Sequence, residues 1–95
     1  MWLELLARYR GGKPVMPVIW RYKGYRFHFF SNEGAIPEPP HIHIRHGERT
    51  AKFWLVPEVA LADSWGMKPF ELNQLRKLVE EKRDDFERAW HEHSP

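Results

Sequence analysis

Four short segments of the sequence alternate apolar and polar residues, and this period of two constrains the fold more than any other feature. The segments cover residues 18–23, 25–30, 41–46 and 50–55. Successive side chains of a β-strand point to opposite faces of a sheet, so the alternation predicts four strands, each with one apolar face. Gly24 separates the first two segments, and residues 47–49 form a turn between the last two. Short connections of this kind predict antiparallel pairs.

Two further elements are expected downstream of these strands. Residues 58–66 predict a short edge strand, with a helical turn as the alternative reading. Pro69 suits the first position of a helix. From there, apolar and long side chains recur at helical spacing, which predicts one helix of about six turns. The stripe consists of Leu72, Leu75, Val79, Lys82, Phe86 and Trp90.

The N-terminal residues show a different pattern. Apolar residues at helical spacing over residues 1–10 predict a short helix, and the Gly-Gly-Lys-Pro run at residues 11–14 predicts a break after it. We therefore expect an N-terminal extension over residues 1–15 and a single domain over residues 16–95. A chain of 95 residues has room for only one domain of ordinary size.

Combining the four strand patterns gives the fold class. The apolar side chains on one face are Val18, Trp20, Tyr22, Tyr25, Phe27, Phe29, Ile42, Ile44, Ala51, Phe53 and Leu55. The C-terminal helix must cover this face, because a sheet with one apolar face has to bury it against another element. The sequence therefore predicts an α+β domain, with a mostly antiparallel sheet of four to five strands and one face covered by a long helix. The tryptophans Trp20, Trp65 and Trp90 are expected in the core.

Composition excludes several classes of function. There is no cysteine, so disulfides, thiolate metal sites and thiol nucleophiles are excluded. No apolar run reaches the roughly 18 residues that a membrane span requires, so we expect a cytoplasmic protein without membrane contact. Fifteen Lys and Arg residues against thirteen Asp and Glu residues give a net charge of only +2, so the distribution of charge matters more than its sum.

The face opposite the apolar one collects basic side chains. Its members are Arg21, Lys23, Arg26, His28, His41, His43, Arg45 and Lys52, together with Ile19, Phe30 and Trp54, and none of them is acidic. A basic sheet face that carries aromatic rings resembles the surfaces with which proteins bind single-stranded nucleic acid. The alternative reading is structural, since the outer face of any antiparallel sheet needs polar residues, and Lys or Arg also protects edge strands.

Two histidines on this face suggest chemistry. His41 and His43 are two positions apart in one strand, which predicts Cα atoms about 6.5 to 7 Å apart on the same side. One imidazole could accept a proton and the other return it, as in metal-independent cleavage of a phosphodiester. Arg21, Arg26, Arg45 and Lys52 are the predicted substrate contacts. No cofactor is implied.

A metal site is a weaker reading of the same histidines. It would need a third ligand, for which His28 is the first candidate and Glu33 or Glu38 the next. His91 and His93 lie at the end of the predicted helix, where positive charge interacts favourably with the helix dipole. We expect these two side chains to be solvated.

Several segments together resemble a known family. They are Met16-Pro17-Val18-Ile19, Tyr22-Lys23-Gly24, Tyr25-Arg26-Phe27, Ser31-Asn32-Glu33, Glu38-Pro39-Pro40-His41-Ile42-His43-Ile44 and Ala51-Lys52-Phe53-Trp54-Leu55. Over residues 16–93 the chain is similar to a small bacterial family catalogued as a domain of unknown function, DUF4160. The resemblance marks His41 and His43 as motif positions. It also implies a partner, a second small protein encoded by a neighbouring gene, in an arrangement similar to a toxin–antitoxin module.

Three functional hypotheses follow. The first is a toxin-like protein of a two-gene module that acts on RNA through the basic face, with His41 and His43 in catalysis. The second is a binding module without enzymatic activity, which holds a protein partner or nucleic acid. The third is a histidine-based metal-binding protein.

Overall fold

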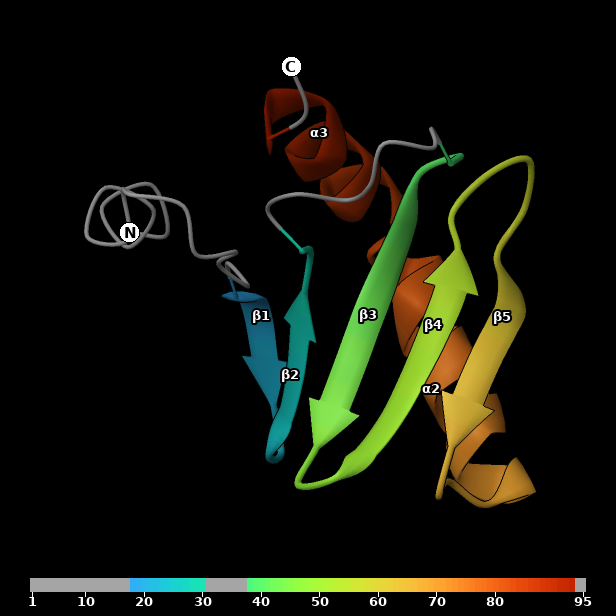
Figure 1. Ribbon diagram of the computed structural model, residues 1–95. Coiled ribbons are helices and arrows are strands. Elements are labelled where there is room, and N and C mark those ends of the chain that lie inside the picture. The colour runs from blue at the N-terminus through green and yellow to red at the C-terminus, as the bar shows by residue number, and fades with distance from the viewer. Residues whose placement is uncertain (1–17, 31–37, 94–95) are drawn as a thin grey trace.

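The described part of the computed structural model comprises residues 18–30 and 38–93. It contains a sheet followed by two helices (Figure 1). The strands are β1 (Val18–Tyr22), β2 (Tyr25–His28), β3 (His41–His46), β4 (Arg49–Trp54) and β5 (Ala60–Trp65). The helices are α2 (Pro69–Glu81) and α3 (Arg83–His93). The predicted helix over residues 1–10 and the proposed extension lie outside the described residues.

The sheet has five strands in the order β1-β2-β3-β4-β5, and every neighbouring pair is antiparallel. Each strand therefore pairs with the one that follows it in the chain, and the sheet is open, with β1 and β5 at its edges. The predicted α+β class is confirmed. The edge strand expected within residues 58–66 is confirmed as β5.

Both helices lie against one face of the sheet and leave the other uncovered (Figure 1). The prediction of one continuous helix was wrong, because the helix is interrupted at Lys82, whose backbone has φ −101° and ψ 9°. Two contacts accompany the change of direction. The Lys82 ammonium lies 4.8 Å from the centre of the Trp20 ring, and Arg83 Nε donates a hydrogen bond of 2.7 Å to the carbonyl oxygen of Leu55.

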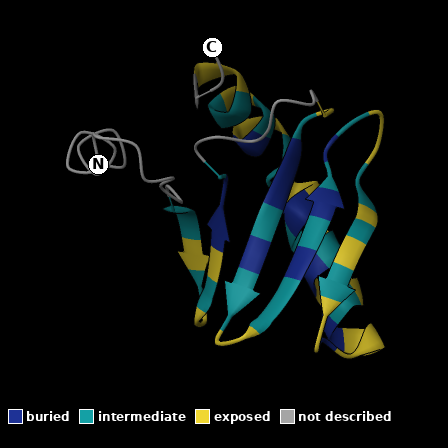
Figure 2. Ribbon diagram, in the orientation of Figure 1, coloured by how far each residue is buried: buried dark blue, intermediate teal, exposed yellow. Residues whose placement is uncertain are grey.

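The core lies between this face and the helices. Its buried apolar residues are Phe27, Phe29, Ile42, Ile44, Ala51, Phe53, Leu55, Met67, Leu75, Val79 and Phe86. The first seven were predicted from strand alternation, and the last three lie on the predicted helical stripe. Burial is concentrated in the central strands, while exposed residues lie mainly on the edge strands, the turns and the outer sides of the helices (Figure 2). Trp20 and Trp90 pack against the core as expected.

A β-bulge changes the phase of β1. Val18 is in register with His28, whereas Trp20 is in register with Phe27, so one extra residue lies on β1 between the two pairs. Ile19 and Trp20 both pack against the core. The prediction that Val18 belongs to the apolar face and Ile19 to the opposite face was therefore wrong, because simple alternation takes no account of a bulge.

A buried polar cluster fastens the first turn of α2 to the sheet. Glu71 is 8% exposed and accepts two hydrogen bonds from Arg49 Nη1, of 2.7 and 2.6 Å. The Tyr25 hydroxyl donates a third hydrogen bond to the same carboxylate. Arg49 was expected in a turn, but it is the first residue of β4.

Within the described residues, no helix is long and apolar enough to span a bilayer.

Candidate functional site

The uncovered face of the sheet carries two cross-strand rows of polar residues, which follow from the strand register. The first, which we call the arginine row, places Arg21 opposite Arg26 and Arg26 opposite Arg45. It continues through Thr50 to Trp65 on β5. Three guanidinium groups thus occupy neighbouring positions on three adjacent strands. The predicted substrate contacts Arg21, Arg26 and Arg45 are brought together, although they come from three separate segments.

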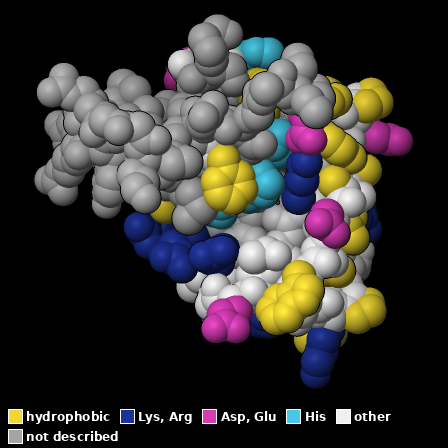
Figure 3. Space-filling view, viewed as in Figure 1, with side chains coloured by type: hydrophobic (Ala, Val, Ile, Leu, Met, Phe, Trp, Pro, Cys, Tyr) yellow, Lys and Arg dark blue, Asp and Glu magenta, His cyan; other side chains and the backbone are white. Residues whose placement is uncertain are grey.

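The second row, here the histidine row, runs parallel to the first. His28 is opposite His43, His43 opposite Lys52, and Lys52 opposite Asp63. The rings of His28 and His43 are stacked with centroids 5.6 Å apart. Phe30 packs edge-on against both, at 5.3 Å from His28 and 4.4 Å from His43. The space-filling view shows histidines at the centre of this face, with basic side chains on either side (Figure 3).

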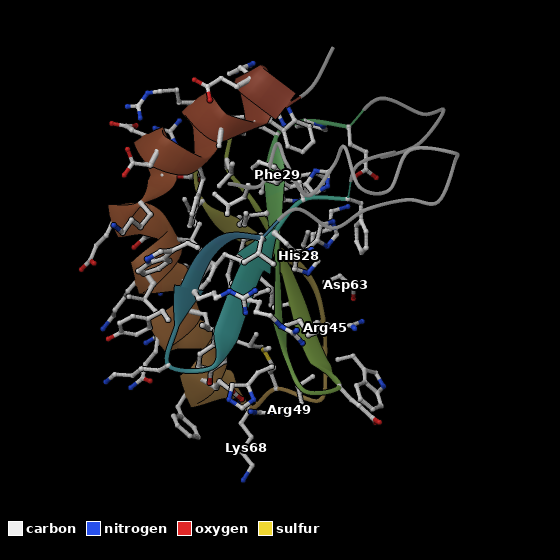
Figure 4. All side chains as sticks on the ribbon, turned by 90° about the vertical axis from the view of Figure 1, so that its left-hand side faces the viewer. His28, Phe29, Arg45, Arg49, Asp63 and Lys68 are labelled. Atoms are coloured by element: carbon white, nitrogen blue, oxygen red, sulfur yellow. The ribbon has the colours of Figure 1, made fainter. Side chains whose placement is uncertain are left out.

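A hollow of about 210 Å³ lies between the two rows. Its lining consists of His28, Phe30, His43, Arg45 and Thr50, with Ile44 and Ala51 from the same two strands, β3 and β4. His28 and Arg45 lie on the side of the sheet away from the helices (Figure 4). The hollow therefore belongs to the uncovered face and is separated from the core by the sheet itself.

The electrostatics of this hollow are set by burial and by positive neighbours. His28 is 4% exposed. Its burial, followed by the nearby His43 and Arg45, lowers the pKa of its imidazole to about 4. At neutral pH the ring is therefore uncharged. Among the described residues, Arg45 Nε is a buried side-chain nitrogen without a hydrogen-bond partner.

His41 occupies a different environment from His43. It was expected on the exposed face, but its side chain is fully buried. The ring lies 4.8 Å from Trp90 of α3, 5.7 Å from Trp54 and 5.0 Å from His43. His41 Nδ1 is 2.9 Å from the carbonyl oxygen of Pro39, which suits an N–H donated to that oxygen. The expected exposure was wrong because α3 covers this end of β3.

The uncovered face was predicted to carry no acidic residue, and this prediction was wrong. Asp63 on β5 points away from the helices (Figure 4) and is in register with Lys52. The Lys52 ammonium also forms an ion pair of 2.7 Å with Glu38 and lies 4.6 Å from the Trp54 ring centre. Lys52 is therefore already engaged by a carboxylate. The concentration of positive charge is narrower than predicted and centres on β1, β2 and β3.

The remaining site predictions have mixed outcomes. In the ranges 18–30 and 38–93, no three His, Asp or Glu side chains are placed to hold a metal ion. Glu33 lies outside those ranges. His91 is exposed as expected, 3.9 Å from Glu87. Trp65 was expected in the core but is 64% exposed, at the end of the arginine row.

Sequence reasoning missed three contributors to this face. Thr50 was seen only as a polar position between apolar ones. Asp63 and Trp65 were left out because residues 58–66 had no firm strand phase. A second bulge, between Lys52 and Phe53 where β4 pairs with β5, shifts the register of this edge. Alternation could have placed Asp63 and Trp65 on the uncovered face only if the position of this bulge had been known.

Fold and site together define an α+β domain with a basic, open sheet face. The sequence profile described as "Domain of unknown function (DUF4160)" matches residues 24–91. Because the match covers more than half of the chain, this protein belongs to that family, as the sequence motifs indicated. Comparison with curated proteins and with solved structures gives no match.

Proposed function

We propose that this protein binds single-stranded RNA across the uncovered face of its sheet. The arginine row carries the proposal. Like charges directly opposite each other in a sheet are destabilising. Arg21, Arg26 and Arg45 nevertheless stand in register on adjacent strands, about 4.8 Å apart, with no acidic residue in their row. A polyanionic ligand offsets this repulsion, and arginine recognises phosphate with paired hydrogen bonds.

Aromatic side chains supply the second component of such a surface. Phe30 and His43 lie beside the arginines, and Trp65 exposes about two thirds of its surface at the far end of their row. Unpaired bases stack on rings of this kind, with a typical contribution of about 1 to 3 kcal/mol per base. Double-stranded nucleic acid has no unstacked bases to offer, so the surface favours a single strand.

Salt dependence tests the binding proposal. Fluorescence anisotropy with a labelled single-stranded RNA, repeated at several salt concentrations, gives the number of phosphate contacts. Each contact to a single strand contributes a slope of about −0.7 in the logarithmic plot of affinity against salt. Arg26→Gln should weaken binding and reduce this slope by about 0.7.

Arg88→Gln is the matched control, because Arg88 lies on α3 and forms a 3.0 Å ion pair with Asp85. It should leave both affinity and slope unchanged. Equal effects of Arg26→Gln and Arg88→Gln would mean that RNA binding follows net charge and not this face. A binding constant that does not change with salt would also contradict the proposal.

Catalysis stays a prediction, and the same incubations test it. Of the two proposed catalytic histidines, only His43 borders the hollow, whereas His41 is enclosed by Trp54 and Trp90. If the protein cleaves RNA without a metal, His43→Ala should abolish cleavage in the presence of a chelator, while RNA binding is weakened by the loss of the ring but remains measurable. Intact RNA after prolonged incubation would leave RNA binding as the function.

The toxin-like role and the protein partner also stay predictions. They would be tested by inducing this chain with and without the neighbouring gene and following growth. A partner-binding module predicts capture of the neighbouring protein that does not depend on the arginine row. An RNA-directed toxin predicts growth arrest that Arg26→Gln relieves.

A further inference from the structure

The hollow between the two rows has the features of a built anion site. Arg45 Nε–H is buried, has no partner within the described residues, and belongs to a residue that lines the hollow. His28, which is only 4% exposed, lines the same hollow, and its neutral ring already has a backbone hydrogen bond with Phe29. An unsatisfied buried polar group costs about 1 to 3 kcal/mol, so the Arg45 N–H beside this hollow indicates that a ligand completes it.

The surrounding charges indicate what kind of ligand this is. Arg26 and Arg45 are directly opposite each other on β2 and β3. Thr50 is opposite Arg45 on β4, and His43 lines the same hollow as both residues. A neutral nucleobase would fit a hollow of this size but would leave the repulsion between the two arginines in place. An oxyanion reduces that repulsion and can accept hydrogen bonds from Arg45 and from the Thr50 hydroxyl, which both line the hollow.

We propose that the hollow binds one phosphate monoester group and, on the basis of the proposed function, that it receives the terminal phosphate of an RNA strand. A terminal phosphate carries a charge of about −1.5 to −2 at neutral pH, whereas an internal phosphodiester carries −1. It also presents three free oxygens, enough to accept hydrogen bonds from both Arg45 and Thr50 at once. The remaining arginines, Arg26 and Arg21, then continue along the row toward the next phosphates.

Two pairs of short RNAs of identical sequence test this site. In the first pair the 5′ end carries a phosphate in one RNA and a hydroxyl in the other, and in the second pair the 3′ ends differ in the same way. Calorimetric titration of the full chain should show about tenfold tighter binding of one phosphorylated RNA than of its hydroxyl partner. Arg45→Gln should remove this preference, and Thr50→Val, which keeps the side-chain shape, should reduce it several-fold.

Arg21→Gln is the matched control, since Arg21 lies in the row but does not line the hollow. This variant should weaken the binding of all four RNAs equally and leave the preference for a terminal phosphate intact. If all four RNAs bind equally well to the unaltered protein, the monoester site is wrong while RNA binding stands.

Inorganic phosphate tests the anion site independently of the proposed RNA binding. Added at constant ionic strength, it should shift the imidazole NMR signals of His28, and Arg45→Gln should abolish that shift. A phosphate-dependent shift without RNA binding would support the anion site and reject the RNA surface. Unchanged His28 signals at millimolar phosphate, together with equal binding of all four RNAs, would overturn the site.

Discussion

At the scale of single residues, the carboxylate of Glu71 connects the sheet to the helical layer. Burial alone would raise the pKa of Glu71, but the hydrogen bonds from Tyr25 and Arg49 outweigh this effect and lower it. The same contacts act in the opposite direction on Tyr25, where burial and the Glu71 carboxylate raise the pKa of the hydroxyl. Because a lowered carboxyl pKa stabilises the fold above the unfolded value of about 4.3, that contribution is lost as pH falls further.

Removing the Tyr25 hydroxyl tests this cluster. Tyr25→Phe leaves Glu71 with its Arg49 contacts but deletes one charge-assisted hydrogen bond, and we expect the free energy of unfolding to fall by about 1 to 2 kcal/mol. Urea denaturation at pH 7 measures the change. Tyr22→Phe is the control, because Tyr22 stacks on Trp20 at 5.3 Å and keeps that contact without its hydroxyl. Equal losses in the two variants would show that the Glu71 hydrogen bond contributes nothing particular.

His28 makes stability depend on pH in a separate window. Its folded-state pKa of about 4 lies below the ordinary histidine value of 6.5, so between these values the unfolded chain binds more protons. The contribution is therefore complete above pH 6.5 and is lost as pH falls toward 4. Its full size is about 3 kcal/mol.

Denaturant titrations at half-unit pH steps measure this slope. His28→Gln cannot titrate, so its free energy of unfolding should be nearly flat between pH 6.5 and 5, whatever its absolute stability. His91→Gln is the control, since His91 is exposed on α3. It should keep the slope of the unaltered protein. A steep slope that survives in His28→Gln would assign the effect to another group.

At the scale of elements, the hairpin between β1 and β2 depends on a glycine for two reasons. Gly24 has φ +85°, and a Cβ placed there would lie 2.9 Å from His46 Nε2 on β3. Gly47, in the hairpin between β3 and β4, has φ +63° but meets no atom within 4 Å. The first turn is therefore tied to its neighbouring strand, while the second is free on its outer side.

These two glycines form a matched pair. Gly47→Ala carries only the backbone cost of a left-handed residue, about 1 kcal/mol. Gly24→Ala carries the same cost plus displacement of the His46 ring, which also packs against Tyr25 at 4.7 Å. Thermal unfolding should show a larger decrease in melting temperature for Gly24→Ala than for Gly47→Ala. The reverse order would mean that the His46 ring moves aside without cost.

At the scale of the whole molecule, opposite faces of the sheet have opposite roles, and the sequence predicts this division well. The seven buried apolar residues in the strands or directly after them, among them Phe27, Ile42 and Phe53, follow from alternation alone, because the face of a sheet that packs against helices is mostly apolar. The same count places Arg21, Arg26 and Arg45 on the far side. The sequence therefore predicts that three segments contribute to one basic face, while their alignment in one row follows from the strand register.

The errors have physical causes that a strand-by-strand count cannot detect. The bulges in β1 and β5 each alter the phase of the pattern, which misplaced Val18 and left Asp63 and Trp65 unassigned. His41 is buried by α3, an element distant in the sequence, and the helix break at Lys82 accompanies contacts to Trp20 and Leu55. Each of these features depends on tertiary contacts, which alternation and helical spacing do not encode.

The order of the strands in space has a consequence for biosynthesis. Each strand can pair with its predecessor as soon as it leaves the ribosome, so the sheet can grow one hairpin at a time. The helices that cover its apolar face, residues 69–93, are synthesised last. Until then the nascent chain exposes a bare hydrophobic surface, and we expect a chain stopped at residue 68 to bind chaperones or precipitate instead of remaining dispersed.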